Sequence, residues 1–168
     1  KQNTEYSYRL ILCPEHVGTV FYLNDMEHED IQNMHCGVFG EMMGTAGPFV
    51  VASSFEGDHL LDRAFRHVVR HSVTEHQFVG FRESVGNDET VWEAPGYEVP
   101  FVQVNRDNRL NGAELPYPEY HSNYDNVDLV KHDLLNEYFE VFKKVVMVLE
   151  TNVTMQRRFN GLIALSNP

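Results

Sequence analysis

The order of short apolar runs and helical stretches indicates an α/β domain, layered around a mostly parallel or mixed sheet. Two observations support this fold class. Strand-like runs alternate with segments of helical periodicity along the 168 residues. One of those segments, 130–149, is a long amphipathic stretch that is expected to cover a face of the sheet. We expect residues 1–168 to form a single domain, because this length is sufficient to bury a core.

Five segments combine apolar residues with turn residues at their ends, as strands do. The first ends at Pro14, the second ends at Gly40, and the last is entered from the pair Pro95-Gly96. The predicted strands are 6–12, 33–39, 48–52, 76–81 and 99–104.

Three segments have the apolar spacing of helices. Segment 17–23 follows the first predicted strand at once, as in a strand-to-helix turn, and 130–149 repeats apolar residues along one side. Segment 58–71 places Leu61, Phe65 and Val68 on one face, and Asp58 is a candidate N-cap. A polar loop is expected at 87–96.

Composition narrows the classes of function. The formal net charge of −12 argues against binding nucleic acid or an anionic membrane surface. No apolar run approaches the roughly 20 residues of a membrane span, and we expect a soluble, cytoplasmic protein. Cys13 and Cys36 are expected to be free, buried thiols rather than a disulfide. The chain opens into a predicted strand and ends on an extended pattern at 159–168, which suggests part of a larger fold.

Candidate functional residues follow the predicted strands. Glu15 and His16 come after the first, Glu41 comes after the second, and His121 lies in the later block PYPEYHSNYD at 116–125. Two prolines stiffen that block, because each fixes its own φ near −65°. In α/β sheets, chemistry gathers beyond the carboxyl ends of strands, so a common site is reasonable. A rigidly held imidazole is what a zinc hydrolase requires of a histidine ligand.

Five motifs in order resemble a known family. They are PEHVGT at 14–19, GDHLLDR at 57–63, NDET at 87–90, PGYEVP at 95–100 and YPEYHSN at 117–123. The pattern resembles the co-catalytic zinc aminopeptidases, and more closely a bacterial aminopeptidase-like branch of unknown function. The resemblance covers nearly the whole chain. It implies a three-layer sandwich of which this chain is the C-terminal portion.

The resemblance also implies roles for individual residues. Glu15 matches the general base, which accepts a proton from the attacking water, and one or two zinc ions would activate that water. His121 and Glu41 match metal ligands. His16 stands where the peptidases carry a second glutamate ligand, and an imidazole could ligate zinc there.

The family's first histidine and bridging aspartate lie upstream of the general-base strand, and nothing before Tyr6 supplies them. Three explanations stay open: the two residues precede Lys1, another chain or segment provides them, or the protein is an inactive relative.

Substrate-binding roles are predicted for four further residues. Asp88 and Glu89 could bind a free amino group or form a solvated turn. Arg106 could hold a carboxylate or phosphate, or pair with Glu119. Tyr120, in the block PYPEYHSNYD, is also assigned to the substrate site.

The expected function is zinc-dependent hydrolysis of a peptide or amide bond in a small substrate. A modified sugar or an antibiotic-like amide is a narrower version of this hypothesis. The alternative is a non-catalytic, peptidase-like binding domain. Self-association as a homo-oligomer and completion by an upstream segment are both compatible with the sequence.

Overall fold

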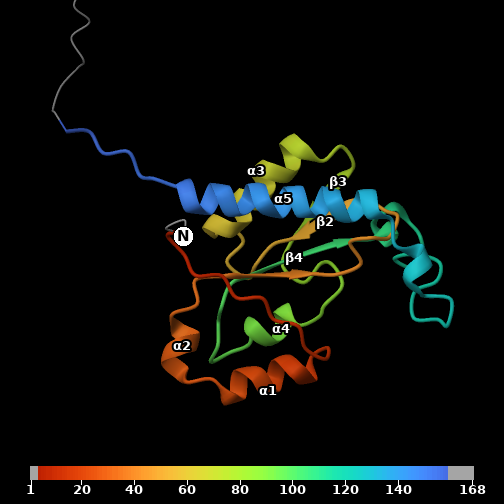
Figure 1. Ribbon diagram of the computed structural model, residues 1–168, viewed down its shortest axis with the longest axis horizontal. Helices are drawn as coiled ribbons and strands as arrows, with labels where there is room; N and C mark the ends of the chain where they lie inside the picture. Colours follow the sequence, from red (N-terminus) through yellow and green to blue (C-terminus); the bar gives the residue numbers. More distant parts are fainter. Residues whose placement is uncertain (1–3, 159–168) are drawn as a thin grey trace, which may run out of the picture.

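The computed structural model describes residues 4–158, which form a sheet between two helical layers (Figure 1). The α/β class and the mixed, mostly parallel sheet predicted from the sequence are confirmed. The strands are β1 (Gly37–Gly40), β2 (Phe49–Ala52), β3 (His76–Val79) and β4 (Phe101–Arg106). The helices are α1 (Val17–Asp25), α2 (His28–Gln32), α3 (Leu60–Ser72), α4 (Glu89–Trp92) and α5 (His132–Thr151), with short 3₁₀ turns at Asn108–Asn111 and Val127–Leu129.

The strand order within the described residues is β1-β4-β2-β3. β1 runs parallel to β4 and β2 runs parallel to β3, whereas β4 and β2 are antiparallel. The register pairs Gly40 with Val104 and Ala52 with Gln103. Because β1 and β4 point the same way, the segments that follow them leave the sheet at one edge. Glu41 and Asp107 therefore begin their loops side by side.

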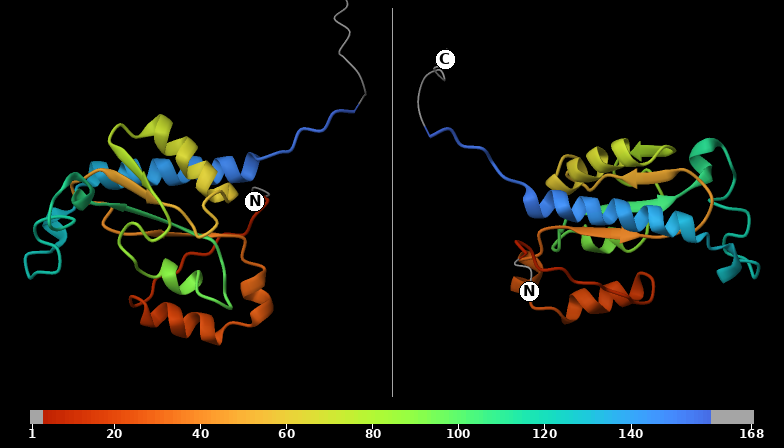
Figure 2. Two further views of the ribbon diagram at one scale, coloured as in Figure 1. Left: turned by 180° about the vertical axis from the view of Figure 1, so that it is seen from behind. Right: turned by 45° about the horizontal axis from the view of Figure 1, so that its top comes forward.

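Helices α3 and α5 cover one face of the sheet, as the two views of Figure 2 show. Their contact with the strands forms the larger apolar core. Phe49, Phe65 and Val104 are completely buried there, and each such side chain contributes roughly 1.5–3 kcal/mol through burial. The helical periodicity of the sequence identified the inward face of α3 correctly.

The opposite face carries α1, α2 and α4 (Figure 1). A second, smaller cluster joins these helices around Leu23, Ile31 and Trp92. The Trp92 ring stacks on Phe101 of β4 at a centroid distance of 5.0 Å. Helices on both faces give the three layers that the family resemblance implied.

The predicted strand at 6–12 is wrong, because this segment is not part of the sheet. Tyr8 and the Tyr6 backbone instead bind the Glu150 carboxylate near the end of α5. Leu10 and Leu12 are 84% and 87% exposed. Within the described residues no strand lies beside this segment to accept its hydrogen bonds.

Smaller differences concern element ends. The strand predicted at 33–39 is confined to β1, and the short helices α2 and α4 arise where no helix was predicted. The N-cap of α3 is His59 rather than Asp58. The His59 Nδ1 accepts the Leu61 N–H at 3.2 Å, and Asp62 accepts the His59 N–H at 3.0 Å. A histidine is not a common cap, so the sequence favoured the neighbouring aspartate.

Cys13 and Cys36 are free, as predicted, and both are partly buried. Within residues 4–158 no helix combines the length and apolar character that crossing a membrane requires. The extended pattern predicted at 159–168 lies outside the described residues.

Candidate active site

The polar side of β4 forms the floor of the candidate site. Successive side chains of a strand point to opposite faces, so Val102 and Val104 enter the larger core whereas Gln103 and Asn105 face the side of α1 and α4. Gln103 is 4% exposed and Asn105 is fully buried. Buried amides need partners, and here those partners come from the loops that follow the strands.

Glu41 is a carboxylate that two side-chain amides hold, those of Gln103 and Asn87. Its backbone N–H donates to the Val104 carbonyl at 3.1 Å, which extends the pairing of β1 with β4. Its two carboxylate oxygens accept from Gln103 Nε2 at 2.7 Å and from Asn87 Nδ2 at 3.0 Å. Burial raises the pKa of Glu41, and the negative charge of Glu15 adds to this, while the two amide donors oppose it.

Glu15 and His16 lie in the turn that leads into α1. The His16 N–H donates to the Asp88 carboxylate at 2.6 Å, which ties this turn to the loop before α4. Glu15 is exposed, and its charge acts on both Glu41 and Tyr120. The turn therefore holds a solvent-accessible carboxylate beside the site.

The proline-rich block is anchored at both ends. Asn108 at the end of β4 donates from its backbone N–H to Pro116 O at 3.1 Å, and the Tyr117 hydroxyl donates to Asp125 at 2.5 Å. Between these anchors the Tyr120 ring stacks on the exposed His121 ring, with centroids 3.8 Å apart.

Tyr120 belongs electrostatically to the same site as Glu41. Burial raises the pKa of the Tyr120 phenol, the charges of Glu41 and Glu15 raise it further, and the nearby Arg109 opposes the shift. The hydroxyl therefore keeps its proton at neutral pH and can donate a hydrogen bond.

Backbone strain also gathers here. Within the described residues, five non-glycine residues have a left-handed φ, and three of them are His16, Met42 and His121, with φ of 53°, 50° and 56°. His16 and His121 are predicted site residues, and Met42 follows Glu41 directly. Such conformations are unfavourable for non-glycine residues and are concentrated at functional sites in proteins.

Asp88 and Glu89 are both buried in their loop rather than exposed to a substrate. Asp88 accepts the His16 N–H, and the Glu89 carboxylate accepts the Asn87 N–H at 2.9 Å. Burial is the main cause that raises the pKa of Glu89, to about 7, and the charge of Glu41 adds to it. Their binding to a substrate amino group stays a prediction, since both carboxylates are engaged by the loop itself.

Arg106 pairs with Glu137 of α5 and not with Glu119. Its guanidinium also donates to the carbonyls of Met43 and Gly47, and the side chain is almost fully buried. These contacts connect β4 to α5. The other predicted role, binding of a substrate anion, stays a prediction, because these partners occupy the guanidinium.

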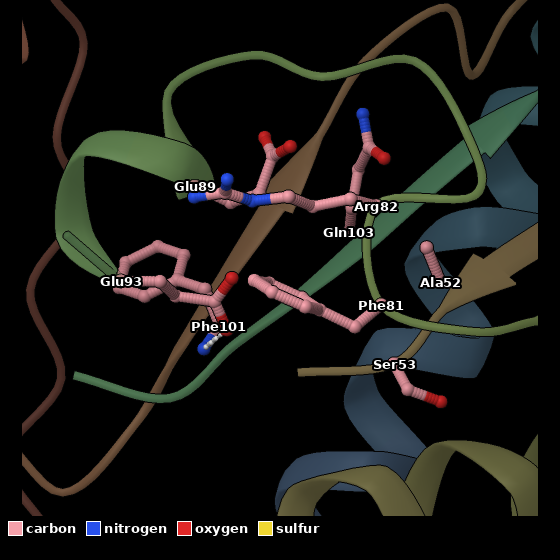
Figure 3. A pocket seen from close by; sticks show the side chains of 8 residues that line it. All are labelled: Ala52, Ser53, Phe81, Arg82, Glu89, Glu93, Phe101 and Gln103. Atoms are coloured by element: carbon pink, nitrogen blue, oxygen red, sulfur yellow. Dashed lines mark hydrogen bonds between the residues drawn. The ribbon is translucent and has the colours of Figure 1, made fainter. Parts of the chain in front are cut away.

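A small cavity lies between α4, β4 and the segment that follows β3 (Figure 3). Its volume of about 10 Å³ suits one water at most. Glu93 accepts the N–H groups of Phe55 and Phe101 through Oε1, while its Oε2 has no partner within the described residues. The cavity is lined by Ala52, Ser53, Phe81, Arg82, Glu89, Glu93, Phe101 and Gln103.

The predicted metal ligands do not assemble into a complete set. Within residues 4–158, no three or more His, Cys, Asp or Glu side chains are placed to hold a metal ion. His121, Glu41 and His16 are not among any such group in the described part of the chain. The described residues therefore do not by themselves fit a zinc ion.

Sequence reasoning missed the residues that support the site. Gln103 was placed in a strand but given no role, although an amide inside an otherwise apolar run is a recognisable signal. Asn87, Asp107 and Arg109 had no such signal, because polar loop residues are usually solvated.

Comparison with known proteins agrees with this fold. Residues 1–152 match the family described as domain of unknown function (DUF4910), and the chain belongs to this family. A protein of Clostridium acetobutylicum, provisionally named a polysaccharide biosynthesis protein with an aminopeptidase-like domain, is 26% identical over 154 residues. That match covers 92% of this chain and 34% of the relative, so the chain spans about a third of the length of that protein.

Solved structures share the fold. A protein from Clostridium acetobutylicum, provisionally named a peptidase, aligns with a TM-score of 0.78 at 24% identity and covers 89% of this chain and 33% of its own. A zinc aminopeptidase from Bacillus subtilis gives 0.63 at 11% identity, covering 80% and 32%. An aminopeptidase from Aneurinibacillus sp. strain AM-1 gives 0.60 at 12% identity, covering 80% and 30%. At these identities the likeness shows an aminopeptidase-type fold.

Proposed function

We propose that this chain forms part of the active site of an aminopeptidase-like hydrolase that cleaves a peptide or amide bond in a small substrate. The observation that carries the proposal is the partly buried Glu41 carboxylate, which Gln103 and Asn87 hold at the end of β1. The charges of Glu15 and Glu41 both raise the pKa of Tyr120. The fold of the zinc aminopeptidases and the name of the Clostridium relative support the same class of reaction.

The chain's own residues have distinct tasks in this proposal. Glu15 is exposed, and it accepts a proton from the attacking water and returns it to the leaving amine. The Tyr120 phenol stays protonated and donates a hydrogen bond to the carbonyl oxygen as negative charge develops there. Glu41 is held by Gln103 and Asn87, and this fixes the carboxylate relative to both groups.

In this proposal the described residues supply only part of a zinc site, and the remaining ligands come from elsewhere. Glu41 and His121 are the two side chains that we propose as ligands, with His16 as a third. Because residues 4–158 do not complete such a set, we propose that other parts of the longer protein complete it. Zinc per chain, determined by elemental mass spectrometry on full-length protein purified without added metal, measures this directly.

Exchange of Glu15 for glutamine tests the hydrolase directly. The amide keeps the size of the side chain but cannot accept the proton, so kcat/KM of Glu15→Gln should fall about 10²–10⁴-fold. The measurement is hydrolysis of aminoacyl amides and dipeptides by the full-length protein. Glu29→Gln, on the exposed side of α2, is the matched control and should retain full activity.

Circular dichroism and thermal melting of both variants show whether they are folded. Hydrolysis by a folded Glu15→Gln protein at the rate of wild type contradicts the proposed role of Glu15. A folded, zinc-loaded wild type with no activity on any amide contradicts the hydrolase and favours the binding domain.

A further inference from the structure

Arg109 is a positive charge at the candidate site that neither the sequence motifs nor the proposed reaction assigns. It follows β4 by three residues, at the edge where β1 also ends and Glu41 begins its loop. The block that carries Tyr120 returns to this edge, because Asn108 donates to the Pro116 carbonyl through both its backbone and its side chain. Arg109 thus lies between the strand ends and the proline-rich block.

Asp107 holds the Arg109 side chain in one orientation. The Asp107 carboxylate is 1% exposed and accepts from Arg109 Nε at 3.0 Å and Nη2 at 2.7 Å. It also accepts the Arg109 backbone N–H at 2.9 Å. Such a two-pronged pair fixes the plane of the guanidinium, as an isolated surface ion pair does not.

One edge of the guanidinium remains available. The pair with Asp107 uses Nε and Nη2, whereas Nη1 makes no hydrogen bond within the described part of the chain. The Arg109 side chain is 38% exposed. A fixed, partly exposed cation with a free N–H edge is suited to bind an oxyanion.

The free edge belongs to the same electrostatic environment as the proposed catalytic groups. Burial raises the pKa of Tyr120, and the charge of Arg109 opposes that shift. Arg109 likewise counteracts the rise that burial causes in the pKa of Glu41. Asn108, next to Arg109, is bonded to Pro116 of the block that carries Tyr120, so Arg109 and Tyr120 lie on two segments that are joined at this edge of the sheet.

We propose that Arg109 binds a carboxylate of the substrate, so that the preferred substrates are short peptides or amides carrying a free carboxylate. This inference rests on the proposed function and names its substrate class. A singly charged carboxylate suits the site better than a phosphate. The protein has a net charge of −12, and Glu15 and Glu41 would repel a dianion. Asp107 is a positioning residue in this arrangement.

Equilibrium binding of two matched ligands tests the carboxylate site. The ligands are alanyl-alanine and its C-terminal carboxamide. They differ only at the C-terminus, which is a charged carboxylate in the first and a neutral amide in the second. Isothermal titration calorimetry on the full-length protein should show the carboxylate form binding about 10- to 100-fold more tightly, as expected for one charge-assisted pair. Arg109→Gln should remove this preference, and Arg63→Gln on α3 should retain it.

Two further variants keep the test decisive if Arg109→Gln does not fold because Asp107 is left unpaired. The double variant Asp107→Asn with Arg109→Gln removes both charges and should also lose the preference. Arg109→Lys keeps the positive charge but loses the planar guanidinium, so its preference for the carboxylate ligand should be reduced but not lost.

Several outcomes would overturn the inference. Equal binding of the two ligands to wild type, no binding of either, or an unchanged preference in the folded arginine variants would each do so. An altered pH profile with an unchanged preference would show that Arg109 acts only on Glu41, and this also overturns it.

Hydrolysis of the same two ligands is measured in parallel. Charge-dependent binding without cleavage supports the carboxylate site and counts against the hydrolase. Cleavage of both ligands without a preference for the carboxylate supports the hydrolase and counts against the carboxylate site.

Discussion

The two faces of one sheet differ in almost every physical property. The face under α3 and α5 buries an apolar cluster in which Phe65 and Val104 are inaccessible to solvent. The face toward α1 and α4 buries polar groups at similar depth, among them Gln103 and Asn105. Val104, Gln103 and Asn105 are neighbouring positions on β4, so the alternation of one strand separates a stabilising core from a candidate chemical site.

Burial of the polar face contributes less favourably to the free energy of folding than burial of the apolar face. Glu93 Oε2 and Asn105 Oδ1 are buried without a partner within the described residues, and each such atom costs about 1–3 kcal/mol. Burial raises the pKa of Glu41, Glu89 and Glu93, which shows that their charged forms are disfavoured. A face that retains such groups is expected to serve function at the expense of stability.

Removing a large side chain from the apolar face should give the largest loss of stability. Phe65→Ala deletes a fully buried ring on α3, and the free energy of unfolding should fall by about 3–5 kcal/mol because a cavity remains. Urea denaturation measures this. Phe139→Ala removes the same group from an exposed position on α5 and should change stability by less than about 0.5 kcal/mol. Equal effects of the two changes would contradict the assignment of the core.

A substitution on the polar face should instead raise the free energy of unfolding, by an amount that depends on pH. Burial raises the pKa of Glu89 from 4.5 to about 7, so the folded protein keeps a proton that the unfolded chain releases between these values. Stability contributed by the protonated group is therefore complete below pH 4.5, is lost as pH rises to 7, and stays lost above it. Glu89→Gln cannot ionise and should avoid this loss.

The stability difference between Glu89→Gln and wild type should grow by up to about 3 kcal/mol from pH 4.5 to 8. Chemical denaturation at several pH values measures the difference. Parallel stability profiles for the two proteins would show that Glu89 does not carry the buried proton.

The contrast between the faces also explains what the sequence could predict. Helical spacing identified the inward face of α3 because apolar burial repeats with a regular period. Glu41 was found because Gly40 marks the end of β1, whereas Glu15 was found from Pro14, which stands in the turn before α1 and not at the end of a strand. The strand at 6–12 was predicted wrongly, since pairing depends on a neighbouring strand and not on the segment alone.

The supporting residues of the site lay beyond sequence reasoning for another reason. Asn87 lies in the NDET motif, but its partner Glu41 is 46 residues away. The role of Arg109 depends on the burial of its partner Asp107, which the sequence does not show. Pairing with Glu119 was one of two roles considered for Arg106, and Glu137 on α5 is its partner instead. Pairing of charges is set by the packing of helices on the sheet, which the sequence alone does not reveal.

The most direct test of the division between the faces is Glu41→Gln, measured for hydrolysis and for stability in the same full-length preparation. Hydrolysis should fall at least about 10²-fold, because the fixed carboxylate is lost. The free energy of unfolding at pH 7 should stay within about 1 kcal/mol of wild type, since the amide avoids burying a charge. Glu140→Gln on α5 is the exposed control. Retained hydrolysis together with a large loss of stability would show that Glu41 is structural, and would contradict the functional role of the polar face.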